Sequence, residues 1–384
     1  MQERVSLSPL AEAMKLCRSI ASALGIAAFL GVTSAFADPA FAPASEGPPY
    51  FYKGYDYGSQ ALEGPLWVFM NRGFDVLQDQ TGSRGRDIFA QSYQVDAKNV
   101  GKNLLNPFPA IKARGWGRFL REEIFPLSYT QSTARWVPNY GLHLVGGGTT
   151  YVALSEWFQA NQVPAPGVFS AGTLLASAFL NETLENKGVV GYNTDAIADF
   201  FFFDIGGILL FSFDWPKVLF SQYIIVSDWS LQPAFTYPDF FLHNQGNYFA
   251  VKFPIPYFNA LRLFASIGLG TLGGLSYKFD REYSVSAGVG NLATRLVPTS
   301  TTNADNDVVF AKSAGLFLDR NDSLLACLRV TDVPDYTFDF NLYPNSFGVP
   351  GLGLWSVVDR NGHFIFGASF SHTMGLGFGI GSLN

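Results

Sequence analysis

The spacing of hydrophobic positions changes once along the chain, near residue 228. Before this point, apolar residues dominate three segments, 140–158, 168–184 and 196–213, which are separated by proline- or glycine-containing stretches typical of helix boundaries. Beyond it, large apolar residues alternate with small or polar ones, which is the period of a strand. The pattern predicts an α+β protein: an N-terminal helical part, then an antiparallel, β-barrel-like C-terminal part over residues 228–384.

The alternation places large apolar side chains on one face of the predicted sheet and glycine or serine on the other. Tyr283 and Val285 share one face, while Ser284 and Ser286 share the opposite face. An outer-membrane barrel turns its apolar face toward lipid, whereas a soluble sandwich turns that face inward. Because a water-facing surface normally carries charged residues, the glycine and serine face favours the barrel. Three further segments share this alternation: 261–279, 364–371 and 376–381.

Polar corners between the alternating segments predict hairpin turns. Asn361-Gly362 is the strongest two-residue hairpin signal, and segments 280–282 and 319–322 are similar polar corners. At roughly ten residues per spanning strand plus turns, residues 228–384 hold about eight to ten strands.

The first 37 residues have the order of a secretory signal peptide. A short basic stretch beginning at Met14 precedes an apolar run over 20–32 and the small-residue site Ala35-Phe36-Ala37. The apolar run is shorter than the roughly 20 residues that a membrane span needs. We therefore expect export and cleavage after Ala37, with an N-terminal membrane anchor as the alternative. Cleavage removes Cys17 and leaves Cys327 as a lone cysteine.

Composition narrows the classes of partner. The chain is 48% hydrophobic and 16% aromatic, but only 15% charged, against roughly 25% in an ordinary soluble domain. The net charge of −6 gives no reason to expect nucleic acid as a partner. The glycine-rich segments lack the Lys-Ser/Thr of a phosphate loop, so we expect no nucleotide. Residues 303–307 lack the glycine and the closing glutamate of a calcium loop, and we expect a solvated loop there, with no metal and no cofactor.

Residues 38–135 are expected to form an extended lead-in followed by basic amphipathic helices. Between residues 98 and 135, seven Lys and Arg side chains stand against Glu122 and Glu123, with apolar residues such as Ile111 and Phe119 among them. A basic amphipathic helix lies either in a membrane interface or on the solvated surface of a globular domain. Both alternatives stay open at this point.

The apolar helical segments of residues 136–227 contain ionisable residues, which are expensive to bury and are candidates for function. Four of them form the predicted ligand site or polar cluster: His143, Glu182, Asp195 and Asp199. Asp195 and Asp199 are four residues apart and share one face of an α-helix. Asp204 lies about 140° away from Asp199 at 100° per residue. The alternative is that Thr194 or Asp195 caps a helix and the other groups are satisfied core residues.

The order of these residues resembles the helical hairpin of VanZ-like and YfiM-like membrane-associated proteins. The resemblance covers residues 140–210: His143, then Glu182, then the segment 193–199 leading into Gly206-Gly207. It implies a location in the cell envelope and no specific reaction.

A serine and histidine constellation near the C-terminus suggests catalysis. Ser369, Ser371 and His372 would supply the nucleophile and base of a lipid hydrolase, with Asp339 or Asp359 orienting the base. Adjacent residues of a strand face opposite sides, however, which separates Ser371 from His372. Small inward residues and a histidine near a turn explain the same pattern without catalysis.

These patterns together predict an exported outer-membrane protein with a structural, assembly or lipid-interacting role and membrane lipid as its partner. The alternative function is an envelope lipid hydrolase or acyltransferase, and the alternative location is the periplasm.

Overall fold

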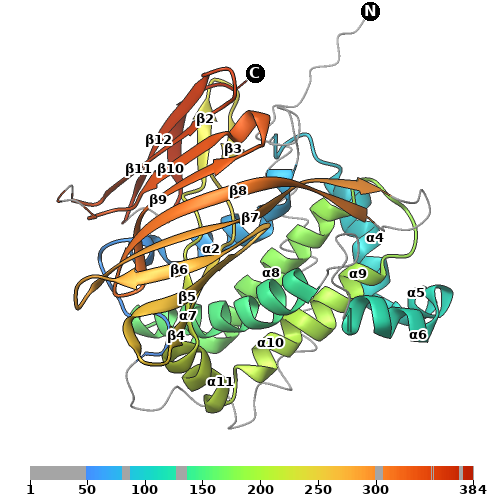
Figure 1. Cartoon of the computed structure of the whole chain (residues 1–384). Helices are drawn as coiled ribbons and strands as arrows, with labels where there is room; N and C mark the ends of the chain where they lie inside the picture. The colour runs from blue at the N-terminus through green and yellow to red at the C-terminus, as the bar shows by residue number, and fades with distance from the viewer. Residues whose placement is uncertain are drawn as a thin grey trace, which may run out of the picture.

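A layer of helices from the first part of the chain packs beside a strongly curved sheet from the second part (Figure 1). The computed structural model describes residues 49–79, 87–126, 136–298, 306–346, 348, 350–371 and 375–383. The expected signal peptide, residues 303–305 and His372 lie outside the described residues. Asn306 and Asp307, expected in a loop, instead begin a strand.

The helical part ends at Tyr223 and the first strand begins at Ile225, which confirms the predicted change of structure near residue 228. Several of its elements are π-helices, namely η4, η5, η6 and η7. The elements in chain order are η2 (Ser59–Leu62), α2 (Pro65–Gly73), η3 (Asp75–Asp79), α4 (Tyr93–Leu105), α5 (Pro107–Arg114), α6 (Trp116–Phe119), η4 (Leu120–Ile124), η5 (Val137–Gly146), α7 (Gly147–Ala160), α8 (Pro166–Glu185), α9 (Thr194–Ile197), η6 (Ala198–Asp204), α10 (Ile205–Leu210), α11 (Asp214–Val218) and η7 (Leu219–Tyr223).

The three predicted helical segments correspond to η5 with α7, to α8, and to α9 with η6 and α10. Prolines at the first or second position start α2, α5, η5 and α8, where a missing N–H costs nothing. The cap of α9 is Asn193, whose side chain accepts a hydrogen bond from the Ala196 N–H at 3.0 Å. The expectation that Thr194 or Asp195 caps this helix is therefore wrong.

The strands form one sheet that is antiparallel except where β13 pairs with β2. In the described part of the chain the strand order is β1-β4-β5-β6-β7-β8-β9-β10-β11-β12-β13-β2-β3. The strands are β1 (Ile225–Asp228), β2 (Ala234–Tyr237), β3 (Phe241–His243), β4 (Phe249–Ile255), β5 (Phe258–Ile267), β6 (Gly270–Lys278), β7 (Tyr283–Pro298), β8 (Asn306–Arg320), β9 (Ser323–Thr331), β10 (Phe338–Leu342), β11 (Leu352–Val358), β12 (Phe364–Phe370) and β13 (Gly377–Gly381), with a 3-10 turn η8 (Pro334–Tyr336) before β10.

The α+β class is confirmed, but the sheet differs from the predicted barrel in two respects. It is not closed into a barrel, and the described residues form thirteen strands rather than eight to ten. The count is higher because β1, β2 and β3 have only four, four and three residues. An estimate based on strands that each span a membrane does not anticipate such short pieces. The polar corners at 280–282 and 359–362 lie between consecutive strands, as predicted, whereas the corner at 319–322 includes the last two residues of β8 and the two-residue turn before β9.

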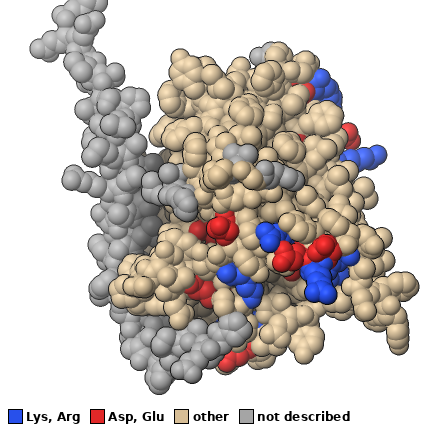
Figure 2. Space-filling model, turned by 90° about the vertical axis from the view of Figure 1, so that its left-hand side faces the viewer, with Lys and Arg blue, Asp and Glu red and all other residues tan. Residues whose placement is uncertain are grey.

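The two faces of the sheet have opposite compositions. The outer face carries a continuous row of cross-strand neighbours, almost all apolar, which we call the outer row. Its members are Phe253, Leu263, Leu275, Ala287, Leu316, Leu328, Phe340, Ser356, Phe366, Ile380 and Tyr237. Their exposure is large even for central strands, at 53% for Leu263, 50% for Leu316 and 46% for Phe366. Figure 2 views the side on which the sheet lies in Figure 1, and Lys, Arg, Asp and Glu occupy only limited areas of it.

The inner face is buried and mixes polar residues, glycines and a few large hydrophobic residues. Ser284 and Ser286 are buried there, opposite in orientation to Val289 on the outer face. A Cβ on Gly315 would lie 2.6 Å from the Phe317 ring, so glycine leaves space for a large inward neighbour. This orientation matches the outward-apolar alternation that the sequence predicts.

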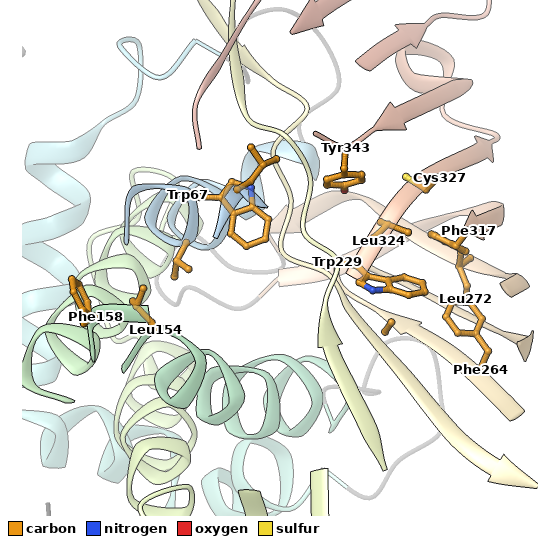
Figure 3. Close-up of a cluster of buried hydrophobic side chains, with 13 residues drawn as sticks. Trp67, Leu154, Phe158, Trp229, Phe264, Leu272, Phe317, Leu324, Cys327 and Tyr343 are labelled. Carbon is orange, nitrogen blue, oxygen red and sulfur yellow. The ribbon is translucent and has the colours of Figure 1, made fainter. Parts of the chain in front are cut away.

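The largest hydrophobic cluster joins the helical layer to the inner face of the sheet (Figure 3). Trp67 of α2 and Leu154 of α7 belong to it, together with Trp229, Phe264 and Phe317 from the sheet part. The Trp229 ring centroid lies 5.8 Å from that of Phe264 and 5.5 Å from that of Phe317. Such tilted aromatic pairs add to the stabilisation from burial alone.

Candidate functional site

The predicted polar cluster assembles in the helical layer around Asp204. The Arg72 guanidinium of α2 forms a buried ion pair with the Asp204 carboxylate. His143 of η5 places Nδ1 3.2 Å from Asp204 Oδ1 and Nε2 3.9 Å from Asp199 Oδ2. Arg72 also donates from Nη1 to the Leu142 carbonyl at 3.4 Å. The site therefore joins side chains from α2, η5 and η6.

Asp204 belongs to this cluster because η6 is a π-helix. In an α-helix, Asp199 and Asp204 would be about 140° apart. A π-helix instead bonds residue i to residue i+5, so residues five apart return to one face. The prediction that Asp204 faces away from Asp199 is therefore wrong. The sequence offers no clear sign of the π-helix, and Arg72 lies too far away along the chain to be recognised.

Glu182 of α8 is a further buried acid, and its carboxyl group interacts with the charges of Asp199 and Asp204. Its Oε1 is buried without a hydrogen-bond partner among the described residues, as is Asp199 Oδ1. Burial, and then the charge of Asp199, raise the pKa of Glu182 well above its usual range. Burial and the charge of Asp195 raise the pKa of Asp199 in the same way. Both carboxyl groups therefore favour the protonated form.

The buried acids of this site favour proton binding. The side chains of Glu182, Asp199 and Asp204 are all buried, and among the described residues only Asp204 of the three forms an ion pair with Arg72. In the part of the chain that the structure describes, no group of three or more His, Cys, Asp and Glu side chains is placed to hold a metal ion. Of the four predicted site residues, His143 approaches Asp199. The charges of the three acids Glu182, Asp195 and Asp199 affect one another.

Glycines allow these helices to approach closely. A Cβ on Gly207 of α10 would lie 2.6 Å from the Leu144 carbonyl oxygen of η5. A Cβ on Gly147 would lie 3.2 Å from Arg72 Nη2. Small residues at such crossings are typical of tightly packed helices in membranes and in dense cores.

The predicted catalytic residues are not brought together among the described residues. The Ser369 hydroxyl, fully buried, donates to the Gln232 side chain. Asp339 accepts hydrogen bonds from Arg329, and Asp359 lies 2.9 Å from His363 Nδ1. Both acids thus have partners of their own. The hydroxyl oxygen of Ser371 is buried without a partner in the described part, and His372 lies outside it.

Three ion pairs on the inner face of the sheet, two of them formed by Lys252, escaped the sequence prediction. Lys252 Nζ lies 2.8 Å from Asp319 Oδ2 and 2.9 Å from Asp322 Oδ1, and Lys252 is almost fully buried. Arg329 donates from Nε to Asp339 Oδ2 at 3.0 Å. A signal exists for the four charged residues that lie in strands, because each falls on the small-residue face of its strand: Lys252, Asp319, Arg329 and Asp339. Their pairing is invisible in the sequence, since the partners come from different strands.

A small cavity of about 50 Å³ adjoins the ion pair of Arg329 and Asp339. Arg329, Asp339, Tyr248 and Asn244 are among the residues that line it, and the Arg329 guanidinium lies 4.3 Å above the Tyr248 ring. The cavity exceeds the roughly 10–15 Å³ that one water molecule needs. The cavity therefore lies within the polar interior of the sheet.

No family model matches this chain, and neither the curated proteins nor the solved structures contain a match. Among the described helices, none alone is long and apolar enough to cross a membrane. The bent pair Thr194–Leu210 and Asp214–Tyr223, with 85° between its halves, passes that test when the halves are combined.

Proposed function

We propose that this protein is an exported outer-membrane protein whose curved sheet contacts membrane lipid through its outer face, in a structural, assembly or lipid-interacting role without a reaction of its own. The observation that carries the proposal is the outer row, which runs through ten cross-strand pairs from β4 to β13 and β2. Its exposed side chains form a contiguous apolar surface. Such a surface is an aggregation hazard in water and is satisfied in lipid.

The buried charges on the inner face also support contact between the outer face and lipid. Lys252, Asp319, Arg329 and Asp339 are buried on the inner face, whereas the outer row contains no charged residue. A water-soluble sheet shows the opposite distribution, with its apolar face inward. A lipid-facing sheet keeps its polar groups inside, where they pair with one another.

The two ends of the open sheet are connected through one segment of the chain. Strands β1 and β2, at or near opposite ends of the strand order, are parts of one run over residues 225–237. Beyond the end of β1, this run is hydrogen-bonded to the segment that connects β3 to β4. The Trp229 N–H donates to the Tyr248 carbonyl at 2.8 Å, and the Leu231 N–H donates to the Gly246 carbonyl at 3.0 Å. Since exposed strand edges are not tolerated in lipid, we propose that these bonds satisfy backbone groups between the two ends of the open sheet, a region that we call the seam.

Helix α2 fastens the seam through its side chains. Trp67 Nε1 and Asn71 Nδ2 donate to the Leu231 carbonyl at 2.8 and 3.0 Å. The Gly246 N–H donates to Asn71 Oδ1 at 2.8 Å. These bonds occupy backbone groups where the regular ladder is interrupted, so α2 takes the place of missing strand pairing.

Fractionation combined with heat-modifiable gel mobility tests the proposal. We expect the full chain to fractionate with the outer membrane and to migrate faster on gels before boiling than after, as a compact barrel-like sheet does. Recovery in the soluble periplasmic fraction, with one mobility at both temperatures, would favour a soluble periplasmic protein instead.

A further inference from the structure

A further surface with exposed apolar side chains lies on the helical layer, and it also carries basic residues. It comprises the end of α4 with α5, α6 and η4, residues 98–125, which we call the basic knob. Helices α5 and α6 project at the edge of the helical layer that is remote from the sheet (Figure 1). The knob is thus separate from the outer row.

Large hydrophobic side chains project from the knob although its inward side is already well packed. Ala110, Ile111, Phe119 and Ile124 are buried in a cluster with Ile197 and Phe203 of the helical layer. On the outside, Leu105 is 84% exposed and Phe108 66% exposed. Trp116, Leu120 and Phe125 are exposed as well. These outer residues do not contribute to the core of the fold.

The charges among them have one sign. The exposed charged residues of the knob are Lys98, Lys102, Lys112, Arg118 and Arg121. The two acids of the knob form ion pairs with two of its arginines. Glu123 lies 2.9 Å from Arg114 Nη2, and Glu122 lies 3.0 Å from both Arg114 Nη2 and Arg118 Nε. Within the described residues, Lys98, Lys102, Lys112 and Arg121 form no ion pair.

We propose that the basic knob binds the head groups of anionic phospholipid, with Phe108 and Trp116 inserted at the membrane interface. The inference rests on the proposed function, because it requires a membrane beside the molecule. Exposed aromatic and aliphatic residues interspersed with unpaired bases are the features by which short helices lie in an anionic interface. An acidic protein partner would match the charge but leaves the scattered aromatic side chains without a groove to fill.

The test uses a fluorescent label in proteoliposomes that contain bromine-labelled phosphatidylcholine as a quencher. The label is attached at Phe108→Cys, and at Phe366→Cys on the outer row as a reference, while the native Cys327 thiol is buried. We expect the reference to be quenched with or without phosphatidylglycerol. We expect the label at position 108 to be quenched several-fold more strongly when phosphatidylglycerol is present. Raising salt from about 0.1 M to about 1 M should reverse that gain.

A charge variant sharpens the test. Lys102→Glu with Lys112→Glu should abolish the phosphatidylglycerol-dependent quenching, since each base near an anionic surface changes affinity roughly fivefold. Lys278→Glu with Arg281→Glu, at the β6–β7 turn, makes the same change in charge and should leave the quenching at 108 intact. An unquenched label at 108 beside a quenched reference would overturn this inference and leave a protein partner for the knob. An unquenched reference would instead contradict the proposed function.

Discussion

The outer and inner faces of the sheet differ in a way that a water-soluble sheet does not. Neighbouring residues of one strand illustrate it: Leu263 is half exposed on the outer face, and Phe264 is buried on the inner face. Next to them, buried Lys252 lies inside while Phe253 projects outward. Hydrophobic residues thus occur on both faces, but charged residues are paired inside and absent from the outer row. The burial of charge, more than the burial of hydrophobic residues, therefore distinguishes this sheet from a water-soluble one.

The largest expected effect comes from breaking a charge pair on the inner face. Lys252→Met leaves Asp319 and Asp322 without their shared cation, and removing one partner of a buried pair costs about 3–5 kcal/mol. Urea unfolding of the protein in detergent micelles measures the loss. The matched control Lys278→Met should have little effect. A loss below about 1 kcal/mol would mean that the inner face is accessible to water.

A charge on the outer face should also be costly, but only in lipid. Leu316→Arg and Phe366→Arg should each destabilise the protein by about 2–4 kcal/mol near the bilayer midplane. The same substitutions on a water-facing surface change stability by roughly 0.5 kcal/mol or less. Folding into vesicles, followed by urea titration, measures the difference. Unchanged stability of both variants would indicate that the outer row faces water.

The seam between the two ends of the sheet should be weaker than either face. Asn71→Ala leaves the Gly246 N–H without its acceptor, at a cost of about 1–3 kcal/mol for an unsatisfied buried group. Amide hydrogen exchange should increase first at residues 229–233 and 244–248. Asn161→Ala, whose side chain only bonds its own helix at an exposed position, is the control. Uniform exchange in both variants would argue that α2 does not fasten the seam.

The smallest expected effect concerns the buried acids of the helical layer. Because the pKa of Glu182 is raised in the folded state, the protonated group stabilises the fold at acidic pH. That contribution is complete below the ordinary carboxyl pKa and is lost as pH rises through the raised value. Glu182→Gln should therefore flatten the pH dependence of the unfolding free energy and exceed the wild type in stability at high pH.

The exposed Asp214→Asn serves as the control for Glu182→Gln. Its profile of unfolding free energy against pH should follow that of the wild type. If Glu182→Gln follows the wild type too, Glu182 is not a buried proton-binding group.

The helical segments, the hairpin corners and the orientation of the strands could be predicted because each depends on local spacing. The period of two around Tyr283 places Ser284 inward whichever strand lies next to it. The short strands β1 to β3 could not be predicted, since their ends depend on contacts with α2, far away in sequence. In the candidate site, His143 and Asp199 were recognisable as acids or bases in apolar segments. Arg72 and the π-helical placement of Asp204 depend on tertiary packing.

The accessibility of spin labels along the outer row in proteoliposomes tests most directly whether the outer face of the sheet contacts lipid. Labels at Leu263→Cys, Leu316→Cys and Phe366→Cys should collide readily with oxygen, which concentrates in lipid, and rarely with a water-soluble nickel chelate. A label at Asn361→Cys, in the β11–β12 turn, should show the reverse. If the three outer-row labels collide mainly with the nickel chelate, the outer face contacts water and the sheet does not face lipid.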